Sequence, residues 1–331
     1  MSTILLTGAT GQLGPFIARR LLRDGHNLVL WSQSWKEPIE GITPRCVDLE
    51  DEGAMRHAFA QAAPDAIIHA AAMSQIAACH ADPAKAQRVN VDSTALLASR
   101  APSRQGGAKS AQRSSAPTAA KADKATGARS PMAPPCRDGA LIYLSTDLVF
   151  DGEQGGYRET DVPTPVNVYG RTKLEAESHV LALDQHTVLR LPLIISPSLV
   201  GRPKFFEQLT TSLREGKPVT LFDDEWRAPL TAEDVAQAVA LALTHRVTGL
   251  FHLAGPQRLS RYEIGVAVAR GMGLDPAPIR RASRLSMQSP EPRPRDTSLN
   301  GEKWLARFPA WKPSTIEEAA RQWGEASGGR Y

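Results

Sequence analysis

The stretch Thr7-Gly8-Ala9-Thr10-Gly11-Gln12-Leu13-Gly14, near the start of the 331-residue chain, decides the fold. It follows an apolar run, Ile4–Thr7, which we predict to be a buried strand, and it opens a predicted helix over Gly14–Asp24. Glycines in such a turn permit a tight bend, close approach of a pyrophosphate to the helix N-terminus, and close helix–strand packing. We therefore predict a dinucleotide-binding turn. Its candidate cofactor-binding residues are Gly8, Thr10, Gly11, Gln12, Leu13 and Gly14.

Strands and helices then alternate up to residue 191. The predicted strands are Asn27–Trp31, Arg45–Val47, Ala66–Ala71, Leu141–Leu144 and Thr187–Leu191. The predicted helices are Glu52–Ala62, a segment from Pro83 towards Ser99, and Thr172–Leu183. Because the strands show little polar alternation, they indicate a parallel sheet covered on both faces. The predicted fold class is α/β, a Rossmann-type doubly wound parallel sheet with a smaller C-terminal substrate lobe.

The chain divides into two predicted parts. Residues 1–191 form a dinucleotide-binding domain, to which residues 231–253 return as a helix and a strand, and residues 192–331 form mainly a substrate-binding lobe. Prolines multiply in that second part, where helices are expected near Arg261–Arg270 and Ile316–Trp323. We expect the lobe to fold over the carboxyl ends of the strands, where open α/β sheets bind their ligands.

One segment supplies most of the basic charge. Residues 100–137 hold eight basic residues and one acid, a local charge of +7 in a chain whose net charge is +4, so the remainder is mildly acidic. The segment lacks Val, Ile, Leu and aromatic residues, and we predict a disordered insertion. A solvated spacer, a mistranslated or mispredicted stretch and a basic docking arm remain open. A nucleic-acid partner is not expected.

Composition indicates an ordinary globular enzyme, with 42% hydrophobic and 22% charged residues. Three widely separated cysteines (Cys46, Cys79 and Cys136) indicate a reducing compartment and no metal site. With neither a secretion signal nor an apolar run of membrane-spanning length, we expect a cytoplasmic protein without a membrane partner. A homodimer is compatible with the sequence, which does not fix the oligomeric state.

The residues after the second strand address cofactor type. NAD sites typically place an acid there for the ribose 2′-hydroxyl. Here that stretch contains Ser32, Ser34 and Lys36, and no acid stands before Glu37. NADP(H) is therefore favoured over NAD(H), and Ser32 is a candidate cofactor contact. Alternatively, the two serines only allow the chain to turn. Further candidate cofactor-binding residues are Asp48 and Leu49 after the third strand, and Ala70, Ala71 and Ala72 after the fourth.

Tyr169 and Lys173 stand four residues apart, so on a helix their side chains share one face. An ammonium beside a phenol lowers its pKa and lets it exchange a proton with a carbonyl oxygen. Strand-end hydroxyls lie upstream, and Thr146 is the candidate for hydrogen-bonding the substrate oxygen, with Ser145 as the alternative. These residues predict hydride transfer at a carbonyl, with Tyr169 and Lys173 also touching the cofactor.

The chain resembles the extended short-chain dehydrogenases, and within them the dTDP-4-dehydrorhamnose reductases. The resemblance rests on TGATGQLG at 7–14, HAAA at 69–72, VN at 89–90, LSTDLVFDG at 144–152, PVNVYGRTKLEAE at 165–177 and RPRDTSL at 293–299. It implies reduction, by NADPH or NADH, of the 4-keto group of a nucleotide-linked deoxysugar. It also implies that Tyr169 donates the proton, Lys173 holds the nicotinamide ribose and Thr146 orients the carbonyl.

The resemblance also implies substrate-binding residues. Arg227 stands seven positions before Asp234, where sugar-nucleotide members carry an arginine that grips the diphosphate, and Arg293 and Arg295 are similar candidates. Two alternatives stay open. One is a nucleotide-sugar epimerase or dehydratase, which usually carries the acid that is missing after the second strand. The other is a non-catalytic NADP-binding subunit like that of methionine adenosyltransferase.

Overall fold

The structure of the protein is a computed structural model that describes residues 1–34, 37–101, 140–200, 204–286 and 288–327. Most of the predicted basic insertion at 100–137 lies outside these residues, as does Lys36. Arg100, however, ends helix α5 (Ser93–Arg100), and Ala101 is buried in the core. The folded chain therefore extends slightly beyond the predicted start of the insertion.

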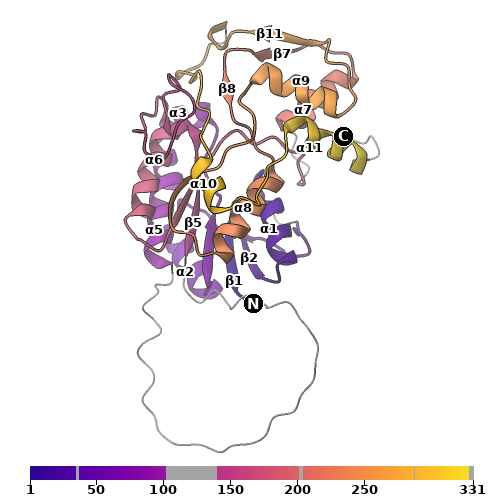
Figure 1. The fold of residues 1–331 in the computed structure, drawn as a ribbon. Coiled ribbons are helices and arrows are strands. Elements are labelled where there is room, and N and C mark those ends of the chain that lie inside the picture. The colour runs from indigo at the N-terminus through magenta and orange to yellow at the C-terminus, as the bar shows by residue number, and fades with distance from the viewer. Residues whose placement is uncertain (35–36, 102–139, 201–203, 287, 328–331) are drawn as a thin grey trace, which may run out of the picture.

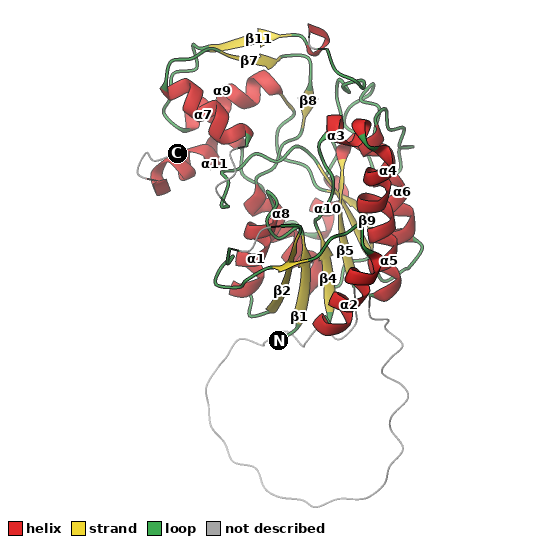
Figure 2. Ribbon diagram, turned by 180° about the vertical axis from the view of Figure 1, so that it is seen from behind, coloured by secondary structure: helices red, strands yellow, loops and turns green. Residues whose placement is uncertain are grey.

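A seven-stranded parallel sheet forms the centre of the molecule (Figure 2). Its order is β3-β2-β1-β4-β5-β6-β9, so the sheet grows outward in both directions from β1 and β4. The strands are β1 (Thr3–Thr7), β2 (Asn27–Ser32), β3 (Arg45–Cys46), β4 (Ala66–His69), β5 (Leu141–Thr146), β6 (Thr187–Leu191) and β9 (Gly249–His252). This order and the parallel pairing confirm the predicted Rossmann-type fold class.

Both faces of the sheet are buried, which explains the apolar strands. In β1, Ile4 and Leu6 point into one core cluster while Leu5, between them, points into another. Helices α1 (Gly14–Arg23) and α8 (Ala232–Thr244) cover the first face. The opposite face is covered by α2 (Glu52–Ala62), α5 and α6 (Val168–Leu181) (Figure 1).

Helix α6 begins earlier than the predicted residue 172. Asn167 has extended backbone and its side chain accepts a hydrogen bond from the Gly170 N–H at 2.8 Å, so it caps a helix that begins at Val168. The predicted helix from Pro83 is instead three consecutive segments, α4 (Pro83–Gln87), a π-helical turn η1 (Arg88–Asp92) and α5. A short helix before them, α3 (Ile76–Ala81), was not predicted.

A smaller group of elements lies beyond the carboxyl ends of the strands, at the opposite end from the N-terminus (Figure 1). It contains the helices α7 (Phe205–Arg214), α9 (Arg261–Gly271) and α11 (Ile316–Ser327). It also contains two small sheets, β7 (Val219–Phe222) with β11 (Ile279–Ala282), and β8 (Trp226–Arg227) with β10 (Leu259–Ser260). These helices share a core of their own, which includes Phe206, Ile264 and Trp323.

The last part of the chain returns to the large sheet. Helix α10 (Glu302–Arg307) carries Trp304, which packs edge-on against Phe251 of β9 and is fully buried. Phe308 and Trp311 join the same core cluster as α1 and α8. Residues 304–311 thus stabilise the sheet, a contribution that the sequence pattern did not reveal because three aromatic residues in a loop-rich segment have no regular period.

Replacing Gly14 by alanine should destabilise the protein. A Cβ there would lie 2.3 Å from the Ala9 carbonyl oxygen, so α1 could not pack against the preceding turn. We expect the free energy of unfolding to fall by about 1–3 kcal/mol in urea denaturation. Gly324→Ala in α11 is the control, because its nearest non-local atom would be 3.6 Å away and helical alanine is favourable. Equal stability of Gly14→Ala and the wild type would contradict this packing argument.

Candidate active site

A cavity of about 500 Å³ opens at the carboxyl ends of the central strands. It lies where the strand order reverses between β1 and β4, the usual ligand position in a doubly wound sheet. The candidate cofactor-binding residues that line it are Gly8, Thr10, Gly11, Gln12, Leu13, Gly14, Ser32, Asp48, Leu49, Ala70, Ala71 and Ala72. Thr146, Tyr169 and Lys173 line the same cavity. The structure therefore brings together both sets of predicted residues.

At Gly8 the backbone of the glycine turn closely approaches the segment after β4, on the wall of the cavity. Gly8 has φ +68°, and a Cβ there would lie 2.6 Å from the backbone nitrogen of Ala71. Gln12 donates from its side-chain amide to the Ile194 carbonyl at 3.1 Å, which ties the turn to the segment after β6. The turn thus leaves backbone N–H groups and the start of α1 accessible to a pyrophosphate.

The end of β2 presents small polar residues to the cavity. Ser32 is buried at the strand end, and Gln33 and Ser34 follow it along the lining. Among the described lining residues the one acid is Asp48, whose carboxylate accepts the Glu50 N–H at 3.0 Å. No described residue therefore supplies the strand-two acid that is typical of NAD sites.

Lys173 is the most deeply buried charged group of the site. Its side chain is 2% exposed, and its Nζ donates to the Leu144 carbonyl at 2.7 Å and lies 4.0 Å from the centre of the Tyr143 ring. Burial lowers the pKa of Lys173 to about 7, and the charge of Glu177 partly opposes this effect. The amine is therefore poised to change protonation near neutral pH.

Tyr169 lies in the first turn of α6, half-buried beside the cavity. Burial raises the pKa of its phenol and the charge of Asp147 adds to the rise, while a hydrogen bond with Thr146 opposes it. The expected lowering of this pKa by Lys173 is not found, because the Lys173 amine is directed to the Leu144 carbonyl. The phenol is consequently protonated at neutral pH, which is the form that an acid requires.

The structure distinguishes the two strand-end hydroxyls. Ser145 donates to the buried carboxylate of Glu177, which forms an ion pair with Arg190 at 2.7 Å. Thr146 instead hydrogen-bonds Tyr169 and donates to Asp147 at 3.1 Å. Thr146 is therefore the better candidate for orienting a carbonyl, while Ser145 serves the network beneath the site.

Two positioning residues were not predicted. Asn90, on the π-helical turn, bonds both the N–H and the carbonyl of Met73 and donates to the Thr172 hydroxyl at 3.0 Å. It therefore joins the segment after β4 to helix α6. The VN pair at 89–90 was visible in the sequence, but its spacing gave no sign of these partners.

The second positioning residue is Glu291. It is buried, and its carboxylate accepts the Val168 N–H at 2.9 Å and pairs with Arg171 at 3.3 Å. It therefore holds the first turn of α6, which carries Tyr169, from a position 123 residues further along the chain. No local pattern in the sequence could have paired these segments.

The predicted substrate-binding arginines lie outside the cavity lining. Arg227 is buried and pairs with Asp147 at 3.3 Å and with Glu225 at 3.4 Å. Arg293 pairs with the other oxygen of Glu225 at 2.7 Å. Arg295 is exposed and donates to the Glu153 carbonyl at 2.8 Å. Arg227 and Arg293 thus share the carboxylate of Glu225. Arg227 also contacts Asp147, which is adjacent to Thr146 in the sequence.

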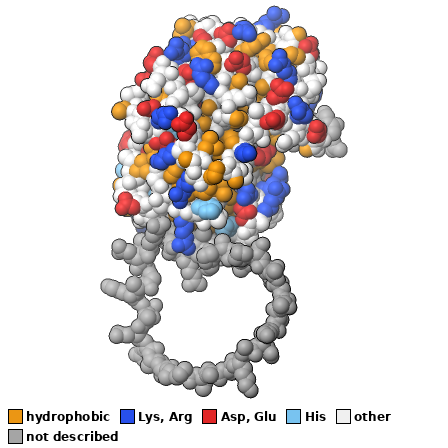
Figure 3. Space-filling model, viewed as in Figure 1, with side chains coloured by type: hydrophobic (Ala, Val, Ile, Leu, Met, Phe, Trp, Pro, Cys, Tyr) orange, Lys and Arg blue, Asp and Glu red, His pale blue; other side chains and the backbone are white. Residues whose placement is uncertain are grey.

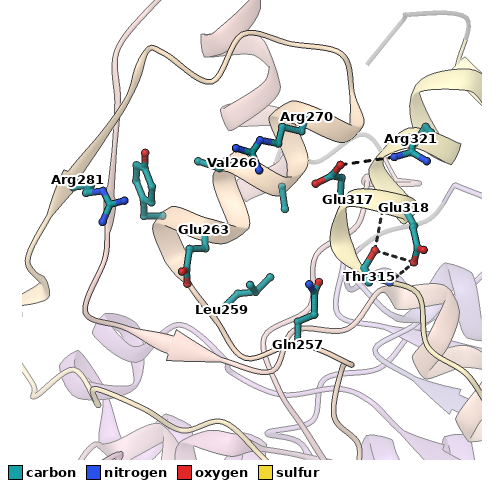
Figure 4. A pocket seen from close by; sticks show the side chains of 12 residues that line it. Gln257, Leu259, Glu263, Val266, Arg270, Arg281, Thr315, Glu317, Glu318 and Arg321 are labelled. Carbon is teal, nitrogen blue, oxygen red and sulfur yellow. Dashed lines mark hydrogen bonds and ion pairs between the residues drawn. The ribbon is translucent and has the colours of Figure 1, made fainter.

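A second cavity, of about 590 Å³, lies between α9 and α11 (Figure 4). Its lining contains none of the predicted site residues. Glu263 is engaged in capping α9 through Ser260, and Glu318 is engaged with Thr315. Glu263 and Glu318 thus have local structural roles, and the first cavity remains the candidate active site.

The surface in Figure 3 and the metal-ligating side chains of the described residues present no competing site. Lys and Arg side chains are interspersed with Asp and Glu on the face shown in Figure 3. Within the described ranges, no group of three or more His, Cys, Asp or Glu residues is arranged to hold a metal ion. Nor does any helix in those ranges have the length and apolar character needed to cross a membrane.

The parallel sheet, the glycine turn and the Thr146, Tyr169 and Lys173 set define an extended short-chain dehydrogenase/reductase. The particular family follows from comparison with known proteins. A family model described as "RmlD substrate binding domain" matches residues 1–115 and 114–323. The chain belongs to this family, the dTDP-4-dehydrorhamnose reductase-like group.

Individual relatives span nearly the whole chain. A dTDP-4-keto-6-deoxy-D-glucose reductase of Streptomyces niveus is 30% identical over 307 residues, covering 91% of this chain and 89% of that protein. The methionine adenosyltransferase 2 subunit beta of Pongo abelii is 27% identical over 320 residues, covering 91% and 80%. The crystal structure of a hypothetical dTDP-4-dehydrorhamnose reductase from Sulfolobus tokodaii has a TM-score of 0.74 at 26% identity, covering 95% and 98%.

Replacing Lys173 by methionine should change how stability depends on pH. The folded pKa of about 7 lies below the ordinary value of 10.5, so between these values the unfolded chain binds more protons. The free energy of unfolding of the wild type should therefore rise with pH relative to Lys173→Met, by at most about 1.4 kcal/mol per pH unit. Urea denaturation from about pH 7 to about pH 9, without added nucleotide, measures this difference.

Lys217→Met, at an exposed lysine, controls for the loss of a surface charge. A constant difference in stability between the wild type and Lys173→Met over this pH range would show that the buried amine does not titrate there.

Proposed function

We propose that the protein reduces the 4-keto group of a nucleotide-linked deoxysugar, with NADPH as the hydride donor. The observation that carries the proposal is that Thr146, Tyr169 and Lys173 line the same cavity as the glycine turn. The similarity to a protein named as a dTDP-4-keto-6-deoxy-D-glucose reductase supports this substrate class. A cytoplasmic location is part of the proposal, supported by the wide separation of the three cysteines.

The residues of the chain divide the chemistry between them. A bound nicotinamide would supply the hydride that adds to the carbonyl carbon. Thr146 turns its hydroxyl proton from Asp147 to the ketone oxygen and so orients the carbonyl. Tyr169 gives its phenolic proton to the same oxygen, so that the ketone becomes an alcohol. Lys173, which lines the same cavity, would hold the nicotinamide ribose, and the phenolate that remains on Tyr169 then recovers a proton. Because the pKa of the Tyr169 phenol is raised, the phenol is protonated before each turnover.

The preference for NADP(H) rests on the end of β2. Ser32, Gln33 and Ser34 offer hydrogen-bonding groups without the negative charge that would repel a 2′-phosphate. The described lining also contains two cations besides Lys173, namely Lys85 and Lys204. Lys85 pairs with Glu50 at 2.6 Å, which leaves Lys204 as the better source of positive charge for an anionic cofactor.

On the substrate side, we propose that Arg227 and Arg293 bind the diphosphate. Planar guanidinium groups suit a diphosphate because each can donate two parallel hydrogen bonds.

We also propose that residues 192–331 form mainly the substrate-binding lobe, while residues 231–253 return to the large sheet. This division agrees with the assignment of Arg227 and Arg293 to the substrate. It is supported by α8 and β9, which pack with the large sheet, and by Arg227, which precedes them on a separate two-stranded sheet.

Two alternatives have different support. Similarity to methionine adenosyltransferase 2 subunit beta favours a regulatory NADP-binding subunit as the second candidate. A nucleotide-sugar epimerase or dehydratase is less favoured, because the acid that such enzymes usually carry after the second strand is missing. Turnover of a nucleotide-linked ketosugar distinguishes the proposed reductase from a regulatory subunit. Net consumption of NADPH distinguishes it from an epimerase or dehydratase.

Replacing Tyr169 by phenylalanine should abolish the reaction while preserving cofactor binding. Loss of the acid should lower kcat by roughly 10²–10⁴-fold, because the proton donor is removed and the ring is kept. The assay is loss of NADPH absorbance with a dTDP-4-keto-6-deoxysugar generated in situ. Tyr262→Phe, a tyrosine that lines the other cavity, is the matched control. Full activity in Tyr169→Phe would refute the assigned acid.

A wild type that binds NADPH but reduces no nucleotide-linked ketosugar would refute the proposed reaction. The regulatory candidate would then require a stable complex with a methionine adenosyltransferase catalytic subunit, measured by analytical ultracentrifugation.

The wild type should bind NADPH more tightly than NADH. An acid at residue 32 should reverse this order, because a carboxylate accepts from a ribose 2′-hydroxyl and repels a 2′-phosphate. We expect Ser32→Asp to weaken NADPH binding by roughly tenfold or more, as measured by quenching of tryptophan fluorescence. Ser99→Asp, on the exposed side of α5, makes the same chemical change away from the cavity. Unchanged NADPH affinity in Ser32→Asp would place the 2′-phosphate elsewhere.

A further inference from the structure

Arg261 is placed beside Glu225 by the pairing of β8 with β10. The antiparallel register sets Leu259 opposite Arg227 and Ser260 opposite Trp226. The next hydrogen bond, from the Arg261 N–H to the Glu225 carbonyl at 3.0 Å, continues that ladder. Residues 225 and 261 therefore face each other at the end of this ladder, where Glu225 precedes β8 and Arg261 begins α9.

Glu225 is already shared by two other guanidinium groups. Its Oε1 lies 3.4 Å from Arg227 and its Oε2 lies 2.7 Å from Arg293. The carboxylate is buried, so solvent screens these contacts weakly. Arg261 is a third arginine near this residue, because its backbone N–H is bonded to the Glu225 carbonyl.

Arg261 lacks an acid of its own. Within the described part of the chain, no carboxylate lies at ion-pair distance from its guanidinium, which instead lies over the Phe205 ring at 4.7 Å. Burial lowers the pKa of Arg261 to about 10; the charge of Glu225 opposes this effect, and the charges of Arg227 and Arg293 strengthen it. In the cluster formed by Glu225, Arg227, Arg293 and Arg261, the positive charge of Arg261 is therefore not balanced by a carboxylate of its own.

The cluster lies next to the reacting groups. Asp147, its second acid, pairs with Arg227 at 3.3 Å and accepts from the Thr146 hydroxyl at 3.1 Å. Burial raises the pKa of Asp147 and so weakens its value as a counter-ion. A ligand whose carbonyl reached Thr146 could thus place an anionic group at the three arginines.

We propose that Arg261 is the third guanidinium of the substrate-diphosphate site, and that Glu225 is the counter-ion that holds Arg227 and Arg293 until the diphosphate arrives. This inference rests on the proposed nucleotide-sugar function. It adds Arg261 to the proposed diphosphate-binding residues, and it adds the replacement of Glu225 by the diphosphate as their anionic partner. With two of the arginines paired to one carboxylate and the third without an ion-pair partner, the cluster carries excess positive charge, which a diphosphate with its several acceptor oxygens is suited to satisfy.

The test is binding of dTDP and of thymidine to the intact protein saturated with NADPH, measured by isothermal titration calorimetry. Arg261→Gln should weaken dTDP binding about tenfold or more, because a charge-assisted contact is lost. It should leave the weaker binding of thymidine unchanged. Arg270→Gln, on the exposed side of the same helix, should bind dTDP like the wild type. NADPH affinity and the far-ultraviolet circular dichroism spectrum report whether Arg261→Gln remains folded.

The outcomes separate this inference from the proposed function. Wild-type affinity for dTDP in a folded Arg261→Gln would overturn the role of Arg261 and leave the proposed reaction intact. Equal loss of dTDP and thymidine binding would also overturn it, since the effect would not involve the diphosphate. Failure of the wild type to bind dTDP at all would count against both. Arg261→Lys, which keeps the charge without the planar fork, should recover part of the affinity.

Discussion

The absence of a side chain at Gly8, where the turn after β1 passes the segment after β4, is the constraint on which the rest of the site depends. The backbone nitrogen of Ala71 occupies the space that a Cβ at Gly8 would need. Because the Gly8 turn and the segment after β4 approach so closely, the ligand crevice lies between β1 and β4, where the strand order reverses. The catalytic strand β5 pairs with β4, so the position of Thr146 is set by this same approach.

A buried polar network supports the site from below. Glu177 lies one helical turn after Lys173 and is held between Ser145 and Arg190. Arg190 also contacts the ring of His252, whose pKa is lowered to about 3 by burial and by the arginine charge. A buried ion pair contributes little net stability, but leaving one partner unpaired is strongly destabilising. The network therefore fixes the relative positions of α6, β6 and β9 more than it adds to stability.

Sequence patterns predicted those features that are encoded locally. The glycine turn, the apolar strands and the four-residue spacing of Tyr169 and Lys173 depend on near neighbours, and their predicted positions hold. The features that were missed depend on distant partners. Glu291 contacts Val168, which is 123 residues earlier in the chain, and Glu225, which Arg227 and Arg293 share, stands just before a strand too short to show a period. The aromatic residues at 304–311 were missed for the same reason, because only the folded sheet gives them a common core.

The contact between Glu291 and the start of α6 has a consequence for how the protein matures. A ribosome releases the segment that contains Tyr169 well before it reaches residue 291, and chains fold progressively as they emerge. The sheet strands up to β6 can pair by then, but the carboxylate that anchors the Tyr169 turn has not been synthesised. The turn that carries Tyr169 therefore gains its anchor only after residue 291 has emerged, later than the strands of the nucleotide-binding sheet up to β6.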